Sequence, residues 1–388
     1  MKLKFQRKKY LFTFAVVIFP ILSMYNTPGF SILPLSDTFL IISIILSAHR
    51  SQIPRINYWV ILPFFVTSFL SLISFIWNGF DSTVLTNFLH FAFCILVISI
   101  FIDDWFDFSI AFKIFKLISI FSIIFLIIQY LILSLRGQYI SGAIPFLTIR
   151  NEDIISFNNT AILGSRARSI FSEPSTFVNY ISIYLAIELF DKRHKLSILA
   201  VLLAFVGIVI SKSSSGYVFA AIISLFWVYD LIHRPNSKKV LVFIASLLFI
   251  PILLIGSGGL DYVIEHVGGT SGTLGQGVGF INRFVGYDHI FDFSKYDFVQ
   301  FIFGNGMVET MIFTTAAAKI FLFFGLLGVA FSIWYLISSY FKLNYSGKCI
   351  LYMMIVQAVF ADSIFGLATM SYVPYLIKLA KEEESNYD

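Results

Sequence analysis

The sequence predicts an all-α, polytopic integral membrane protein with about 11–12 transmembrane helices and two long outer-face loops. Of its residues, 58% are hydrophobic and only 13% are charged, and the mean hydropathy is +0.86. Apolar segments of about 20 residues, the length that an α-helix needs to cross a bilayer, recur along the whole chain. We therefore expect one integral membrane domain over residues 1–388, embedded in the lipid bilayer.

The first apolar segment follows a cluster of basic residues between Lys2 and Lys9. A signal peptide has the same pattern, but no small-residue cleavage site closes this segment. We expect an uncleaved first helix with its N-terminus in the cytoplasm. The net charge of +5 then reflects the usual cytoplasmic excess of Lys and Arg, and it requires no nucleic acid as a partner.

The other spans are placed by apolar runs that polar or basic residues separate. In order, the expected spans are residues 10–25, 30–48, 58–77, 84–102, 112–135, 174–190, 196–211, 217–233, 240–256, 316–340 and 349–366, with a short twelfth helix at 367–378. The stretch from Cys349 to Lys378 is too long for one span and too short for two full spans. It therefore predicts a pair of short helices that turn near Asp362.

Threading these spans in order places most basic residues on the cytoplasmic face, which supports this orientation and also predicts a cytoplasmic C-terminus. Of the 27 Lys and Arg residues, the outer face keeps only Arg136, Arg150, Arg166, Arg168, Lys212, Arg283, Lys295 and Lys319. The two long connections, about 136–172 and 257–313, lie on the outer face and hold most of these residues. Loops longer than about 15 residues are usually functional or disordered, so we expect a functional site there.

The run Arg166-Ala-Arg-Ser-Ile-Phe-Ser-Glu-Pro-Ser175 places two guanidinium groups and a carboxylate where the sixth span begins. Proline is favoured at the first helical position, so the helix should start at Pro174 with Ser172 or Glu173 as its cap. A helix N-terminus beside arginines suits a phosphate group, because both supply positive charge and hydrogen-bond donors. The alternative is that Glu173 only caps the helix while the arginines extend to the membrane interface.

Further candidate site residues lie in or beside the second long loop. Arg283 is the only arginine there, and it could bind an anion or pair with Asp288 or Asp292 as a solvated residue. His289 follows closely, although a single loop histidine is more often incidental than catalytic. Lys319 and Asp37 should lie near the outer ends of their spans, where either could line a polar cavity or the two could pair with each other. No ligand set at metal-site spacing accompanies these residues, so we expect no metal and no cofactor.

Two groups of residues carry a resemblance to a known family. The first is Arg166-x-x-Ser-x-Phe-x-Glu-Pro-Ser before a span, and the second is Arg283 followed by Phe303-Gly-Asn-Gly and Phe324-Gly-Leu-Leu-Gly328. They resemble motifs of bacterial repeat-unit polymerases for O-antigen and capsular polysaccharide, the Wzy-type enzymes of the O-antigen polymerase and ligase superfamily. Span number, orientation and the two outer loops are similar over the whole chain, whereas the sequence similarity is confined to these motifs.

The resemblance implies a metal-independent glycosyltransferase in the bacterial inner membrane. Its donor would be an oligosaccharide on undecaprenyl pyrophosphate, and its acceptor would be a sugar hydroxyl of a second lipid-linked repeat unit. Glu173 would be the catalytic base, while Arg166 and Arg283 would stabilise the charge that develops on the pyrophosphate. The substrate-binding residues would be Arg168, His289 and Lys319. A chain-length regulator protein would be a further partner.

The sequence leaves two alternative functions open. An O-antigen ligase uses similar chemistry, but such ligases usually carry a histidine shortly before the span that follows the second long loop. Here that position reads Phe313-Thr-Thr-Ala-Ala-Ala-Lys319, without a histidine. A flippase for lipid-linked oligosaccharides, or another transporter, would be expected to have short loops, intramembrane charges and two related halves. This chain instead concentrates its arginines in long loops.

Overall fold

The structure is a computed structural model that describes residues 2–48, 54–79, 81–150, 166–261, 264, 287, 290–308, 314–361 and 369–380. Its regular structure is almost entirely helical, which confirms the predicted all-α class. Within the described part, six helices are long and apolar enough to cross a membrane: α3 (Tyr58–Asn78), α4 (Ser82–Trp105), α5 (Phe108–Arg136), α9 (Ser214–His233), α10 (Ser237–Gly256) and α14 (Ala316–Lys342). The protein therefore has the architecture of a polytopic helical membrane protein.

Further helices occupy the other predicted positions. They are α1 (Lys2–Leu22), α2 (Leu35–Ala48), α7 (Pro174–Phe190), α8 (Ile198–Ile210), α15 (Tyr345–Phe360) and α16 (Thr369–Lys378). The bounds of α7 coincide with those of the predicted sixth span. α15 and α16 are the predicted pair of short helices, although α15 begins at Tyr345, before the predicted start at Cys349. The expected turn at Asp362 lies outside the described residues.

One predicted span begins too early. Residues Phe30–Pro34 form strand β2, which pairs antiparallel with β1 (Asn26–Thr27), so that α2 starts only at Leu35. Gly29 turns the chain between the two strands with a φ of 82°, a backbone conformation that glycine adopts most readily. Proline suits a helix start better than a helix interior, so Pro34 favours the later start of α2.

The second predicted loop, residues 257–313, is not wholly irregular. It contains a short 3-10 helix, η1 (Phe293–Lys295), and helix α13 (Phe298–Phe303). Asp297 and Gln300 form a capping box for α13: Gln300 N donates to Asp297 Oδ1 at 2.8 Å, and Asp297 N donates to Gln300 Oε1 at 3.3 Å. α13 is too short for an apolar period to reveal it in the sequence.

The chain divides into two compact units, and each is discontinuous in sequence. Unit 1 comprises Met1–Arg50 and Asp107–Gly279, and unit 2 comprises Ser51–Phe106 and Phe280–Asp388. The predicted site residues Arg166, Arg168 and Glu173 therefore belong to unit 1, whereas Lys319 belongs to unit 2.

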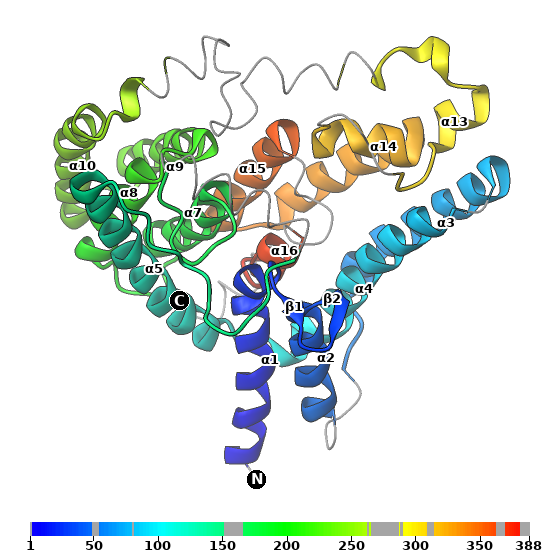
Figure 1. Cartoon of the computed structure of the whole chain (residues 1–388), viewed down its shortest axis with the longest axis horizontal. Helices are drawn as coiled ribbons and strands as arrows, with labels where there is room; N and C mark the ends of the chain where they lie inside the picture. The colour runs from blue at the N-terminus through cyan, green and yellow to red at the C-terminus, as the bar shows by residue number, and fades with distance from the viewer. Residues whose placement is uncertain are drawn as a thin grey trace. The chain divides into compact units, whose positions relative to one another are not determined.

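In unit 1, α7 is the central helix and packs against α5, α8 and α9, while α10 packs on α8 (Figure 1). Nearly every side chain of α7 from Phe177 to Phe190 is buried. A helix that is apolar on all sides is expected inside a bundle rather than at its surface. The predicted site thus lies at the N-terminus of the most enclosed helix of the unit.

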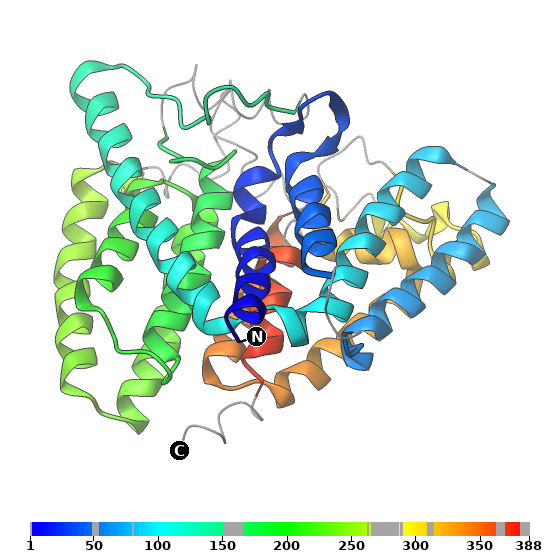
Figure 2. The same cartoon turned by 90° about the horizontal axis from the view of Figure 1, so that it is seen from below.

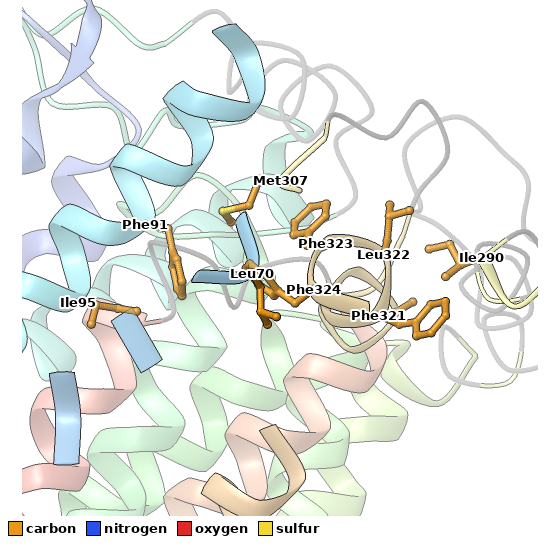
Figure 3. Packing of buried hydrophobic residues seen from close by; sticks show 10 residues of the cluster. Leu70, Phe91, Ile95, Ile290, Met307, Phe321, Leu322, Phe323 and Phe324 are labelled. Carbon is orange, nitrogen blue, oxygen red and sulfur yellow. The ribbon is translucent and has the colours of Figure 1, made fainter. Parts of the chain in front are cut away.

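In unit 2, α3 and α4 lie side by side, and α14 packs against α3, α13 and α15 (Figure 2). The core of this unit joins α3, α4 and the first half of α14 through side chains that include Leu70, Phe91 and Phe324 (Figure 3). α14 is broken at Gly325, whose φ of 63° and ψ of −163° are not helical. The two glycine motifs noted in the sequence meet at this break.

The loop that follows α13 supplies hydrogen bonds at the break in α14. Asn305 N donates to the Leu322 carbonyl at 2.8 Å, and Gly306 N donates to the Phe323 carbonyl at 3.0 Å. A broken helix leaves carbonyl groups without intrahelical partners. Here backbone N–H groups of another segment donate hydrogen bonds to these carbonyls. A Cβ on Gly325 would lie 2.4 Å from the carbonyl oxygen of Ile302, so the two backbones pass too closely for any other residue.

We expect Gly325→Ala to destabilise the protein by at least about 1–3 kcal/mol, because it combines a left-handed φ with a backbone clash. Thermal unfolding of the purified protein in detergent measures the effect. Gly256→Ala is the matched control, since a Cβ at Gly256 meets nothing within 4 Å. Equal melting temperatures for the two variants would contradict this account of the break.

Candidate functional site

α7 starts where the sequence predicts, with Pro174 as its first residue and Glu173 in the N-cap position. Glu173 has the extended backbone of a cap, with φ −142° and ψ 157°. Of the two expected cap residues, Glu173 is thus the one at the N-cap, but its side chain makes no capping hydrogen bond. The half-buried Glu173 carboxylate instead accepts the Ser175 hydroxyl at Oε2, at 3.0 Å. Asp, Asn, Ser and Thr cap helices best, and glutamate is longer than all of them.

Arg168 is fully buried beside this helix start, with 0% of its surface exposed. Its Nη1 donates to the Ser172 carbonyl at 3.2 Å, and its guanidinium carbon lies 5.5 Å from the centroid of the Tyr139 ring. Burial lowers the pKa of Arg168, while the Tyr139 hydroxyl and the Glu173 carboxylate oppose that shift. The side chain stays charged at neutral pH, because the ordinary pKa of arginine is very high. A buried cation is thus fixed directly before α7.

The residue after Arg168 is held in an unusual conformation by α5. Ser169 has a φ of 59°, which few residues other than glycine adopt. Its N donates to Gln129 Oε1 and its Oγ donates to the Ser122 carbonyl, both at 2.7 Å. Gln129 Nε2 donates in turn to the carbonyls of Ser169, at 3.3 Å, and Ile140, at 2.9 Å. A buried amide on α5 therefore determines the path of the chain beside Arg168.

The start of the first long loop packs against the same segment. A Cβ on Gly142 would lie 1.8 Å from the Ser169 carbonyl oxygen, so only glycine fits there. Ile144 N donates to Tyr25 Oη at 2.8 Å, and Tyr25 forms an isolated β-bridge with Ile149. The described part of this loop is thereby tied both to the segment after α1 and to the Arg168 segment.

We expect Gln129→Leu to destabilise the protein by about 1–3 kcal/mol, because it leaves buried backbone groups of Ser169 and Ile140 without partners. The side chains are similar in size, so lost packing should contribute little. The measurement is the melting temperature in detergent. Leu131→Ala serves as the control, since Leu131 lies on the same helix but is 48% exposed. A Gln129→Leu protein as stable as the wild type would refute the role of this amide.

The structure brings Arg168 and Glu173 together at the start of α7. Arg166 is half-buried two residues before Arg168 and is the more accessible of the two arginines. Lys319 lies in the first turn of α14 in unit 2, with its Nζ 6.0 Å from the centroid of the Phe323 ring. The predicted residues Arg283 and His289 lie outside the described residues.

Gln129, Tyr139 and Ser169 belong to the site but were not predicted. For Gln129 the sequence carries a usable signal, namely an amide inside the apolar span 112–135, where polar side chains are costly unless they are satisfied. For Tyr139 and Ser169 no local signal exists, because their roles depend on contacts with α5 and with Arg168.

Comparison with known protein families, with curated proteins and with solved structures finds no match. Fold and site together define a polytopic helical membrane protein with a buried cation and a carboxylate at the start of its most enclosed helix. Arg168 donates to the backbone directly before α7, and the Glu173 carboxylate in the N-cap position accepts the Ser175 hydroxyl.

Proposed function

We propose that the protein is a metal-independent glycosyltransferase of the Wzy type, which polymerises lipid-linked oligosaccharide repeat units at the outer face of the bacterial inner membrane. The product would be O-antigen or capsular polysaccharide. The substrates would be two oligosaccharides on undecaprenyl pyrophosphate, one as donor and one as acceptor.

In the proposed reaction, a hydroxyl oxygen of the acceptor sugar attacks the anomeric carbon of the donor. The bond between that carbon and the pyrophosphate oxygen breaks, and the lipid pyrophosphate leaves with the electron pair. Glu173 takes the proton of the acceptor hydroxyl. Arg166 and Arg283 stabilise the charge on the leaving pyrophosphate, and His289 and Lys319 bind substrate. Arg168 acts as a positioning residue, because it is buried and bonded to the backbone next to Glu173.

The observation that supports this proposal best is that the Glu173 carboxylate makes no capping bond within the described residues and yet is held in place. Glu188, at the other end of α7, provides a contrast. Its fully buried carboxylate accepts from Lys116 Nζ at 3.2 Å, Tyr184 Oη at 3.0 Å and Ser197 N at 2.6 Å. Glu188 thus has the partners of a structural carboxylate, whereas the hydrogen bond that the structure gives Glu173 is a single local one, from Ser175 to Oε2.

The proposal includes a topology with 11–12 spans, cytoplasmic N- and C-termini, and loops 136–172 and 257–313 on the outer face. Cysteine-accessibility labelling tests it: Thr148→Cys should react with a membrane-impermeant reagent in intact cells, and Asn236→Cys should react only after lysis. The native Cys94 and Cys349 are both 0% exposed, so background labelling should be low. Labelling of both positions in intact cells would overturn the orientation and move the arginines to the cytoplasm.

The glycan phenotype of a deletion strain tests the reaction itself. A polymerase mutant should retain only single-repeat glycans at the surface. Loss of all surface glycan with accumulation of lipid-linked polymer would identify a ligase instead. Loss of every glycan outside the cell would identify a flippase.

A further inference from the structure

The short helix α13 in unit 2 is apolar on nearly every side, yet the protein does not enclose it. Five of its six residues are apolar, and Gln300 is the exception. Within the part of the chain that the structure describes, no residue of α13 is buried, and Phe298 is 79% exposed. A helix that is apolar all round belongs inside a protein or in lipid. Because the protein leaves α13 uncovered, lipid is the medium that matches it.

Two hydrogen bonds fix the start of α13 at the end of a helix that is long and apolar enough to span a membrane (Figure 1). Trp77 Nε1, near the end of α3, donates to Asp297 Oδ2 at 2.8 Å, and Gln300 Nε2 donates to Asn78 Oδ1 at 2.9 Å. α3 has 21 residues. It is therefore about 30 Å long, which equals the thickness of the hydrocarbon core of a bilayer. The end of α3, and with it the start of α13, thus lies at the boundary between hydrocarbon and lipid head groups.

Polar groups in and beside α13 have partners within the protein, as contact with lipid requires. Asp297 and Gln300 form the capping box at the start of α13, and Gly304 N donates to the Gln300 carbonyl at 2.8 Å at its end. Asp292 and Lys295 form an ion pair at 3.1 Å. Polar groups without partners are costly in hydrocarbon. The pairing therefore lets this segment lie against a bilayer.

Apolar side chains next to α13 extend the same exposed surface. Ile76 and Trp77 on α3 are 76% and 55% exposed, and Phe293 on η1 is also exposed. Phe321 on α14 holds the segment to the unit, with its ring centroid 5.7 Å from that of Phe293 and 5.8 Å from that of Phe301. Tryptophan and phenylalanine are common where a protein meets the membrane interface. The exposed surface is thus continuous with the end of a spanning helix and has the composition of an interfacial one.

We propose that η1 and α13 form an interfacial membrane anchor, in which Phe298 inserts among phospholipid acyl chains just below the head groups. The partner is the bilayer itself. The second long loop is then held at the membrane surface by its own apolar helix, and the bonds to α3 and the packing on α14 set the depth of that helix. This inference concerns the membrane alone and does not depend on the reaction proposed above.

Site-directed spin labelling of the full-length protein in phospholipid vesicles tests the anchor. One label is placed at Phe298→Cys, and the references are Phe69→Cys, exposed near the middle of α3, and Asn236→Cys, exposed before α10. Collision of each label with oxygen, which concentrates in hydrocarbon, is compared with collision with a water-soluble nickel chelate. We expect the label at 298 to lie about 5–10 Å inside the head-group boundary. Its ratio of oxygen to nickel access should therefore fall below that at 69 and clearly exceed that at 236.

The two reagents also separate lipid from the other possible surroundings of α13. Free access of the nickel chelate at position 298 would place the helix in water and overturn the proposal. Low access of both reagents would show that protein covers the helix, for example a second copy of the chain, and would overturn it equally. If Phe298→Cys does not fold, Phe293→Cys on η1 provides the same measurement, with the same interfacial depth expected. No glycan synthesis is required, so this result and the deletion phenotype can fail independently of each other.

Discussion

Glu173→Gln is expected to abolish the polysaccharide ladder while leaving the abundance of the protein unchanged. Glutamine keeps an oxygen that can accept the Ser175 hydroxyl, and the start of α7 does not depend on a capping bond from this side chain. The substitution therefore removes the proposed proton acceptor with little effect on the fold. Loss of a general base lowers a reaction rate by about 10²–10⁴-fold. The measurement is ladder length in strains with matched protein abundance.

Two further variants sharpen this test. Ser175→Ala removes the hydrogen bond to Glu173 but keeps the carboxylate, so we expect activity to fall by less than about tenfold. Glu173→Asp keeps a titratable group but withdraws it by one methylene, so it should be severely impaired. A near-normal ladder from Glu173→Gln would show that the carboxylate is structural, and His289 would then be the next residue to test.

Arg166→Ala and Arg283→Ala are each expected to abolish polymer at near-normal protein abundance. A leaving pyrophosphate gains negative charge as its bond to the sugar breaks, and a guanidinium stabilises that charge more in the transition state than in the ground state. Removal of such a contact typically costs on the order of 100-fold or more in rate. The measurement is the polymer ladder together with immunodetection of the protein in membranes.

Lysine should rescue either arginine poorly, since an ammonium group cannot form the paired hydrogen bonds of a guanidinium with phosphate oxygens. Lys295→Ala is the matched control from the second long loop. Lys295 Nζ lies 3.1 Å from Asp292 Oδ2, and both side chains are well exposed, so this ion pair should contribute little to stability or activity. Full-length polymer from both alanine variants would reject charge stabilisation by these arginines.

Continuous apolar runs made most helices of this protein predictable from the sequence. α3 and α7 match the predicted spans within a residue or two, because the apolar run and its polar ends are local properties of the chain. The start of α7 was also predictable, since proline strongly favours the first helical position. The candidate site could be located at Arg166–Ser175 for the same reason: charges and a proline interrupt an apolar sequence there.

The arrangement inside that site depends on contacts between residues far apart in the chain. Gln129 on α5 holds Ser169, and this contact sets the path of the chain beside the buried Arg168. The break in α14 likewise depends on backbone groups of Asn305 and Gly306 from the preceding loop. Apolar periodicity reports which side chains avoid water, but it does not report which distant partner satisfies a buried polar group. The sequence alone therefore predicts which residues form helices. The hydrogen-bond partners of the buried polar groups are determined by how the helices pack.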